Sequence, residues 1–318
     1  MTPAITRRQT SAWSKPFRSP KPEIYSREMS LDISRVKGTK AMSISLQQFA
    51  AMNMVYNRYS FSFFLDSMQR LNISNFELWT GAPHLNCMFE TMADAASVRK
   101  AVRERGLHMV CLTPEQVMYP YNIAAVNPEL RRKSLDYFHR YIDMTSELEI
   151  DKMLCCAGWG DYDEPDKQSA WKRSVDALGE MTLHAEKAGV TLAFEILQPT
   201  ESNLVYDFAS TKHMMEEIEH PNFQLCVDTV PVRREGKTLA DYFEAFGSRI
   251  CHLHLTDGTP VGHVPCGMGN MDIAAQLRDM QRYQYEKYIT LEIGDTSWAA
   301  EPERATQFGF DTIKRFLY

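Results

Sequence analysis

From Leu46 onward, short apolar runs alternate with longer amphipathic stretches, and this alternation restricts the fold more than any other feature. The apolar runs predict strands near residues 46–52, 75–79, 108–112, 152–156, 190–195, 223–228, 250–255 and 288–292. The stretches between them predict helices near residues 60–71, 92–105, 129–149, 168–188, 209–219, 239–247, 271–283 and 303–317. Strands that alternate with helices form a parallel sheet, and eight such units close into a (β/α)8 TIM barrel of the α/β class.

A doubly wound open sheet is the main alternative for this pattern. That fold normally carries a glycine-rich phosphate turn after its first strand. Here the first predicted strand is followed by NMVYNRYS, residues 53–60, which contains no glycine. The sequence therefore favours the barrel, and we expect residues 42–318 to form one catalytic domain.

Residues 1–41 differ in composition from the rest of the chain. They hold nine Lys and Arg residues against three acidic ones, and four prolines interrupt any helix. No apolar segment follows Arg7-Arg8, so neither a twin-arginine nor a secretory signal is predicted. We expect a basic N-terminal extension that is disordered or serves as an oligomer-contact arm. Translation assigned upstream of a true start near Met29 or Met42 is the other explanation.

Charge and cysteine content exclude several classes of protein. The formal net charge of −6 opposes an extended nucleic-acid surface, and no apolar run approaches the roughly 20 residues of a membrane span. The seven cysteines have neither zinc-ribbon nor disulfide-framework spacing, which favours buried thiols in a cytoplasmic protein. Cys266 differs, because the polar loop VPCGMGN makes it the candidate for an accessible thiol.

Four consecutive predicted strands end on residue types that bind divalent metals. The segments LAFE, LCVD, HLH and ITLE end on Glu195, Asp228, His254 and Glu292. In a barrel, the carboxyl ends of all strands lie on one face. Three carboxylates buried together would repel one another at a cost of several kcal/mol unless a cation joined them. Three carboxylates with one imidazole suit Mn²⁺, Mg²⁺ or Co²⁺ better than a thiol-bound zinc.

Other residues near these strand ends leave alternatives open. His252 precedes His254 by two positions, so both imidazoles share one face of the strand. We expect His252 to lie one layer deeper and support the site, with direct ligation as the alternative. Trp79 and Tyr121 follow strand ends and could form the pocket wall, or could simply pack in the core. The glycine-rich segment 258–269 is either a mobile lid or a phosphate-binding loop.

Several of these stretches resemble the xylose isomerase-like sugar isomerase/epimerase superfamily. The closest resemblance is to fructoselysine 3-epimerases, and a more distant one is to D-tagatose and D-psicose 3-epimerases. The resemblance spans about residues 46–318 and is carried by FELWTGAPH (76–84), LTPEQVMYPYN (112–122), FEILQPTESN (194–203), VDTVPV (227–232), HLHLTDG (252–258), HVPCGMG (263–269) and TLEIG (290–294). The family's Pro-Gly-x-Gly turn is extended here to PCGMG, residues 265–269.

The resemblance implies a function and a set of site residues. Glu195, Asp228, His254 and Glu292 match the family's ligands of a divalent ion, with Mn²⁺ expected and Mg²⁺, Co²⁺ or Ni²⁺ as alternatives. Glu195 and Glu292 match the catalytic pair that removes and returns a proton beside the carbonyl of a ketose or ketosamine. The resemblance implies that Glu201 and His84 contact the sugar. The further candidates for sugar contacts are Tyr121, Trp79, His252, Asp257 and His263.

The alternatives within the superfamily are a sugar-phosphate 3-epimerase, an aldose–ketose isomerase and, more remotely, a metal-dependent abasic-site endonuclease. A catalytically silent sugar-binding barrel is a further alternative, which the presence of both glutamates opposes. The acidic loop 161–166 favours an unphosphorylated sugar, unless its acids merely cap the next helix. We expect a homo-oligomer, either a dimer or a tetramer, with no nucleic-acid or membrane partner.

Overall fold

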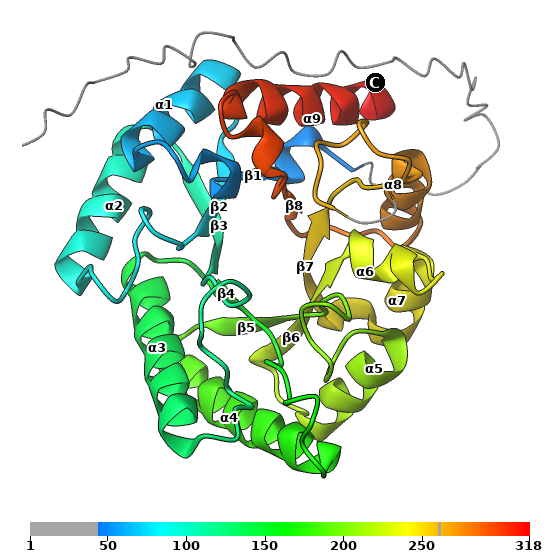
Figure 1. Ribbon diagram of the computed structural model, residues 1–318. Helices are drawn as coiled ribbons and strands as arrows, with labels where there is room; N and C mark the ends of the chain where they lie inside the picture. The colour runs from blue at the N-terminus through cyan, green and yellow to red at the C-terminus, as the bar shows by residue number, and fades with distance from the viewer. Residues whose placement is uncertain (1–43, 260–261) are drawn as a thin grey trace, which may run out of the picture. The chain divides into compact units, whose positions relative to one another are not determined.

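A computed structural model describes residues 44–259 and 262–318. The predicted N-terminal extension, residues 1–41, lies outside the described residues. Within them, parallel strands close into a barrel in the order β1 to β8, with β1 paired to β8 (Figure 1). The strands are β1 (Phe49–Met52), β2 (Asn75–Trp79), β3 (His108–Thr113), β4 (Lys152–Cys155), β5 (Thr191–Glu195), β6 (Phe223–Asp228), β7 (Ile250–Leu255) and β8 (Ile289–Leu291). The predicted TIM barrel is confirmed.

Helices surround the barrel and connect its strands, as Figure 1 shows. They are α1 (Phe61–Leu71), α2 (Met92–Glu104), α3 (Pro128–Glu147), α4 (Lys167–Ala188), α5 (Phe208–Glu217), α6 (Thr229–Arg234), α7 (Leu239–Phe246), α8 (Ile273–Arg282) and α9 (Pro302–Leu317). Short 3₁₀ turns are η1 (Leu46–Gln48), η2 (Met54–Tyr56), η3 (Gly247–Arg249) and η4 (Thr296–Trp298). Only α6 was not predicted, because six residues are too few to show a helical period.

Side-chain caps set where several helices begin. The Ser60 hydroxyl accepts a hydrogen bond from the backbone N–H of Phe63 at the start of α1, and Thr91 forms a reciprocal capping box with Asp94 at the start of α2. Asp228 caps α6 by accepting from the backbone N–H of Val230 at 2.8 Å. The Asp228 carboxylate is therefore fixed in place by the helix that follows it, immediately above the end of β6.

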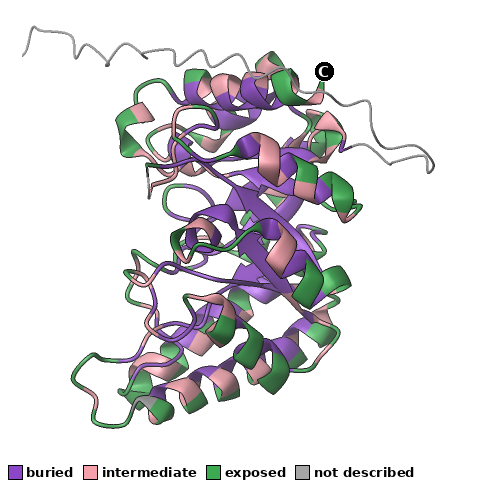
Figure 2. Cartoon of the chain, turned by 90° about the vertical axis from the view of Figure 1, so that its right-hand side faces the viewer, coloured by how far each residue is buried: buried purple, intermediate pink, exposed green. Residues whose placement is uncertain are grey.

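Two apolar cores hold the barrel together. The larger one lies between the strands and the surrounding helices. A smaller cluster comes from barrel strands alone and fills the barrel interior: Ala50, Val110, Cys111, Leu154, Ala193, Cys226 and Cys251. In Figure 2 the strands are mostly buried, whereas the outer faces of the helices carry the exposed residues. Because successive strand residues alternate between faces, Glu195 and Asp228 point the same way as Ala193 and Cys226, one layer higher.

All seven cysteines are free and buried within the described residues. The expectation of an accessible Cys266 is wrong, because this side chain is only 2% exposed and contacts the backbone carbonyl of Leu255. Its loop folds back over the barrel instead of extending into solvent. None of the helices in the described ranges combines the length and the apolar character needed to span a membrane.

Candidate active site

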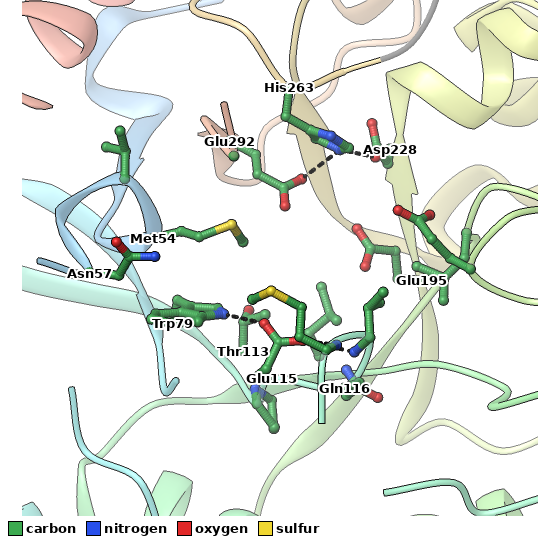
Figure 3. Close-up of a pocket in the computed structure, with 18 of the residues that line it drawn as sticks. Met54, Asn57, Trp79, Thr113, Glu115, Gln116, Glu195, Asp228, His263 and Glu292 are labelled. Atoms are coloured by element: carbon green, nitrogen blue, oxygen red, sulfur yellow. Dashed lines mark hydrogen bonds and ion pairs between the residues drawn. The ribbon is translucent and has the colours of Figure 1, made fainter. Parts of the chain in front are cut away.

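The four predicted metal ligands converge at the carboxyl end of the barrel. His254 Nδ1 lies 2.6 Å from Glu195 Oε1 and 3.1 Å from Glu292 Oε2. Asp228 joins this group through His263, whose Nε2 lies 3.1 Å from Asp228 Oδ2 and 3.5 Å from Glu292 Oε2 (Figure 3). The described structure thus groups Glu195 with His254 and Cys226, and Asp228 with His263 and Glu292, as two sets of ligand-type side chains that the contacts of His254 and His263 with Glu292 connect.

The donor set fits a divalent cation. His254 Nδ1 and Glu292 Oε2 are buried and make no hydrogen bond within the described part of the chain. A buried polar atom without a partner costs about 1–3 kcal/mol, so such atoms usually face a ligand or an ion. Three carboxylates and an imidazole nitrogen from these two sets would supply a cation with the hard oxygen and borderline nitrogen ligands that Mn²⁺ or Mg²⁺ accepts.

The environments of the two candidate catalytic glutamates differ. Burial raises the pKa of Glu195 to about 8, although the nearby His254 opposes this shift. Burial also disfavours ionisation of Glu292, but His263 and His254 outweigh it and lower the pKa of Glu292 below its ordinary value. Two carboxyl groups whose pKa values are pushed apart suit the separate roles of acid and base.

His263 lies between two carboxylates, those of Asp228 and Glu292. Burial lowers the pKa of its imidazole, but Glu292 and Asp228 overcome this effect and raise the pKa to about 10. The backbone carbonyl of His263 accepts hydrogen bonds from the N–H groups of Gly294 and Asp295 at 3.0 and 3.1 Å. This contact ties the glycine-rich segment to the chain that follows β8.

A cavity of about 260 Å³ opens above the four ligands. Trp79, Glu201 and His263 line it, and their predicted contact with a substrate stays a prediction. The carboxylates on its wall are Glu115, Glu195, Glu201, Asp228, Glu292 and Asp295. Among the described residues that line the cavity there is no Lys or Arg. The cavity therefore favours a neutral or cationic ligand over an anionic one.

The wall opposite the ligands is built around Glu115, which sequence reasoning did not single out. Its carboxylate accepts hydrogen bonds from Trp79 Nε1 at 3.0 Å and from the backbone N–H groups of Val117 and Met118 at 2.8 Å each. The neighbouring Gln116 accepts from the backbone N–H of Cys156 at 2.9 Å. These contacts fix the indole of Trp79 and the loop after β3 against the cavity (Figure 3).

Two predicted substrate residues lie away from the cavity because other contacts use them. Both ring nitrogens of His84 are occupied, Nδ1 by Asn53 and Nε2 by the carbonyl of Tyr59, each at 2.8 Å. Tyr121 stacks on Tyr137 with ring centroids 4.0 Å apart. Neither side chain belongs to the cavity lining, so both are corrected to structural positions.

Asp257 is also corrected, since it anchors a loop instead of facing the cavity. It is 1% exposed and accepts hydrogen bonds from the backbone N–H groups of Gly258, Gly267, Gly269 and Met271 at 2.8–3.0 Å. A Cβ on Gly269 would lie 2.1 Å from Asp257 Oδ1, so this close approach requires glycine. Asp257 thus holds the glycine-rich segment that carries His263.

His252 is 0% exposed and does not line the cavity, so it lies deeper than the cavity, as expected for a supporting residue, and does not reach the position of a sugar contact. Its Nε2 lies 2.8 Å from Glu77 Oε2 and 3.0 Å from Thr290 Oγ1. Glu77 on β2 was missed by sequence reasoning, although a carboxylate inside the apolar run FELW was an available signal. Burial would raise the pKa of Glu77, but His254 and His252 lower it well below its ordinary value.

The acidic loop after β4 does not line the cavity in the described structure. Asp166 caps α4 by accepting from the backbone N–H of Gln168 at 3.0 Å, and Glu164 forms an ion pair with Arg173 at 2.8 Å. The capping alternative therefore accounts for Asp166, and the ion pair with Arg173 accounts for Glu164. The cavity wall, and not this loop, carries the charge that would select a ligand.

A profile of the xylose isomerase-like TIM barrel family matches residues 65–316. The chain belongs to this family. It is 28% identical to a fructoselysine 3-epimerase of Shigella flexneri over 78% of this chain and 90% of that protein. It is 23% identical to a D-psicose 3-epimerase of Ruminiclostridium cellulolyticum over 42% of this chain and 47% of that protein. The predicted resemblance is confirmed.

Solved structures share the fold at lower identity. The structure of an L-ribulose 3-epimerase superposes with a TM-score of 0.70 at 19% identity, covering 84% of this chain and 94% of that one. The structure of a 3-keto-D-glucoside 4-epimerase from E. coli gives a TM-score of 0.68 at 16% identity, covering 85% and 98%. At these identities the likeness establishes the barrel alone.

Proposed function

We propose that this protein is a divalent-metal-dependent carbohydrate isomerase that epimerises C3 of a ketose or ketosamine. One observation carries the proposal: Glu195 at the end of β5 and Glu292 directly after β8 approach the same imidazole nitrogen of His254, and both line the cavity that Trp79 also lines. The naming of relatives as 3-epimerases supports the reaction type. We propose Mn²⁺ as the cation, with Mg²⁺, Co²⁺ and Ni²⁺ as alternatives.

Epimerisation requires removal of a proton from the carbon beside a ketone and return of a proton to the opposite face. Glu195 ends β5 and Glu292 follows β8, so the two carboxyl groups come from separate positions on the barrel rim. One removes the proton as a base while the other, protonated, donates one, and a positioned acid or base typically contributes about 10²–10⁴-fold. A bound cation would supply Lewis-acid stabilisation of the charge that develops on the sugar.

His254 and Asp228 would then hold the cation, together with the two glutamates. Glu201 and His263 line the cavity beyond them and would orient the hydroxyl groups of the sugar. Trp79 offers an apolar face, which suits the C–H surface of a sugar ring or chain. These roles divide the site into a reactive side and a binding side.

The proposed substrate is unphosphorylated. Of the carboxylates that line the cavity, Glu115, Glu201 and Asp295 would not bind the cation, and none of the lining residues within the described ranges is Lys or Arg. A phosphate ester would meet like charge there, whereas a plain ketose or one carrying an ammonium group would not. The same wall opposes a nucleic-acid backbone as ligand, which disfavours the endonuclease alternative.

The test is a panel of ketoses, ketosamines and their phosphate esters with Mn²⁺-loaded protein, with products identified by NMR. We expect a C3 epimer as product and a higher kcat/KM for each unphosphorylated sugar than for its ester. Preference for the esters would contradict the substrate assignment and indicate a sugar-phosphate 3-epimerase. An aldose product would indicate an aldose–ketose isomerase instead.

The cysteines bear on the cellular compartment of the protein, and its oligomeric state is a separate question. Seven free, buried thiols in the described chain support a reducing compartment, and we propose a cytoplasmic enzyme. We also propose a homo-oligomer, either a dimer or a tetramer. Light scattering of the full chain would test the assembly, and a monomer at all concentrations would contradict it.

A further inference from the structure

A single buried carboxylate lies directly beneath the proposed metal ligands. Glu77 is 0% exposed and comes from β2, whereas the ligands come from β5 to β8. His254 Nε2 lies 3.1 Å from each of its oxygens, and His252 Nε2 lies 2.8 Å from Oε2. The Thr113 hydroxyl also donates to Oε1. Both oxygens are therefore fully used by donors from β3 and β7.

Two irregularities in the sheet bring these groups together. The register between β2 and β3 shifts at Phe76 and Glu77, and the register between β6 and β7 shifts at Leu225 and Cys226, so that Cys226 pairs with His252. Such a bulge re-aims the side chains that follow it. One register shift lies at Glu77 and the other lies opposite His252. The backbone, and not only the side-chain rotamers, therefore brings Glu77 and His252 together.

The contact fixes which nitrogen of His254 carries the proton. An ionised carboxylate can only accept hydrogen bonds, so His254 Nε2 must donate to Glu77. In the neutral imidazole the lone pair is then on Nδ1, the atom that faces Glu195 and Glu292 without a hydrogen bond within the described part of the chain. Rotation of the ring would break both contacts with Glu77 and leave that charge buried with fewer donors.

We propose that Glu77 is a positioning residue that holds His254 in the tautomer and orientation required to bind the divalent cation through Nδ1. The proposal rests on the proposed metal dependence of the enzyme. A carboxylate that orients a ligating histidine typically changes metal affinity about 10–100-fold. Glu77 touches neither the cavity nor its ligand, so it acts only through His254 and His252.

The first experiment measures Mn²⁺ affinity by calorimetry for metal-free wild-type protein and for Glu77→Gln, which keeps the size but removes the charge. We expect the Mn²⁺ Kd to rise about 10–100-fold, while kcat at saturating Mn²⁺ changes far less. Glu235→Gln is the matched control, because Glu235 is also a hydrogen-bonded carboxylate, which accepts from the Tyr242 hydroxyl at 2.6 Å, but does not line the cavity. Its Mn²⁺ Kd should stay at the wild-type value.

An unchanged Mn²⁺ Kd in Glu77→Gln, with only a lower melting temperature, would overturn the proposal and assign Glu77 a structural role. If wild-type protein binds no Mn²⁺, Mg²⁺, Co²⁺ or Ni²⁺, the proposed metal dependence fails as well, so the two failures are distinguishable. A second measurement needs no folded Glu77 variant. In ¹⁵N NMR of wild-type protein with Mg²⁺, we expect His254 as the Nε2–H tautomer, and the Nδ1–H tautomer would overturn the proposal.

Discussion

The two sides of the cavity are built in different ways. On one side, the ends of β5 to β8 place Glu195, Asp228, His254 and Glu292 directly from the barrel. On the other side, Trp79 and the loop after β3 form a wall held by local hydrogen bonds to Glu115. The strand ends hold side chains rigidly enough for chemistry, and the wall can vary without disturbing them. The difference supports the proposal that the first side carries catalysis and the second side selects the substrate.

Removal of the cation should have the largest effect on turnover, because Glu195, Asp228, His254 and Glu292 at the strand ends would all lose the ion that they are proposed to bind. We expect turnover to fall to background after chelation and to return with Mn²⁺ or Co²⁺. The measurement is initial rate with the C3-epimerised ketose, with elemental analysis of the stripped protein. Full turnover in a verified metal-free preparation would contradict the assignment of this side.

Glu195→Gln and Glu292→Gln should each lower kcat by at least about 10²-fold, as expected for an acid–base group. Each change keeps the size of the side chain and removes its ability to exchange a proton. Steady-state kinetics at saturating Mn²⁺ checks the prediction, and the wall variant Glu115→Gln is the comparison. A variant of either strand-end glutamate that keeps wild-type kcat would show that the proton moves elsewhere.

Trp79→Phe should have a smaller effect of another kind. It keeps an aromatic face but loses the indole N–H that donates to Glu115 at 3.0 Å. We expect KM to rise about 3–10-fold, consistent with losing roughly 1 kcal/mol of ordering from one hydrogen bond, and kcat to change little. A fall in kcat without a change in KM would show that the wall takes part in the chemical step.

Truncation to a chain that begins at Met42 should have the smallest effect. Residues 1–41 carry no motif and precede the first strand, so kcat and the Mn²⁺ requirement should equal those of the full chain. Circular dichroism and turnover of the truncated protein provide the measurement. If the truncated chain did not fold, the prediction that residues 1–41 are dispensable would be wrong.

The strand-end side could be predicted from the sequence, and most of the rest could not. An apolar run that ends on Glu195 or Asp228 predicts both a strand and the position where that strand ends. Because the strands of the barrel are parallel, these ends lie on one face. Glu77 could not be placed in this way, because its partner His252 lies 175 residues further along the chain. Only the closed sheet brings the two together.

The mistaken substrate residues share one cause. His84, Tyr121 and Asp257 lie in or near loops at the correct end of the barrel, so their position along the chain fitted the site. Their side chains nevertheless contact nearby parts of the chain. Asp257, for example, accepts hydrogen bonds from the backbone N–H groups of Gly267 and Gly269. The conformation of a loop determines whether a polar side chain binds a ligand or stabilises the loop itself. This conformation cannot be predicted from a single sequence.

The most direct test of the central claim is proton exchange at C3, followed by NMR in D₂O with Mn²⁺-loaded protein and then metal removal. We expect deuterium at C3 of both the substrate ketose and its epimer, and no incorporation with Glu195→Gln/Glu292→Gln or without the cation. Epimerisation without deuterium at C3, or deuterium only at C1, would contradict proton transfer at C3 by the two glutamates.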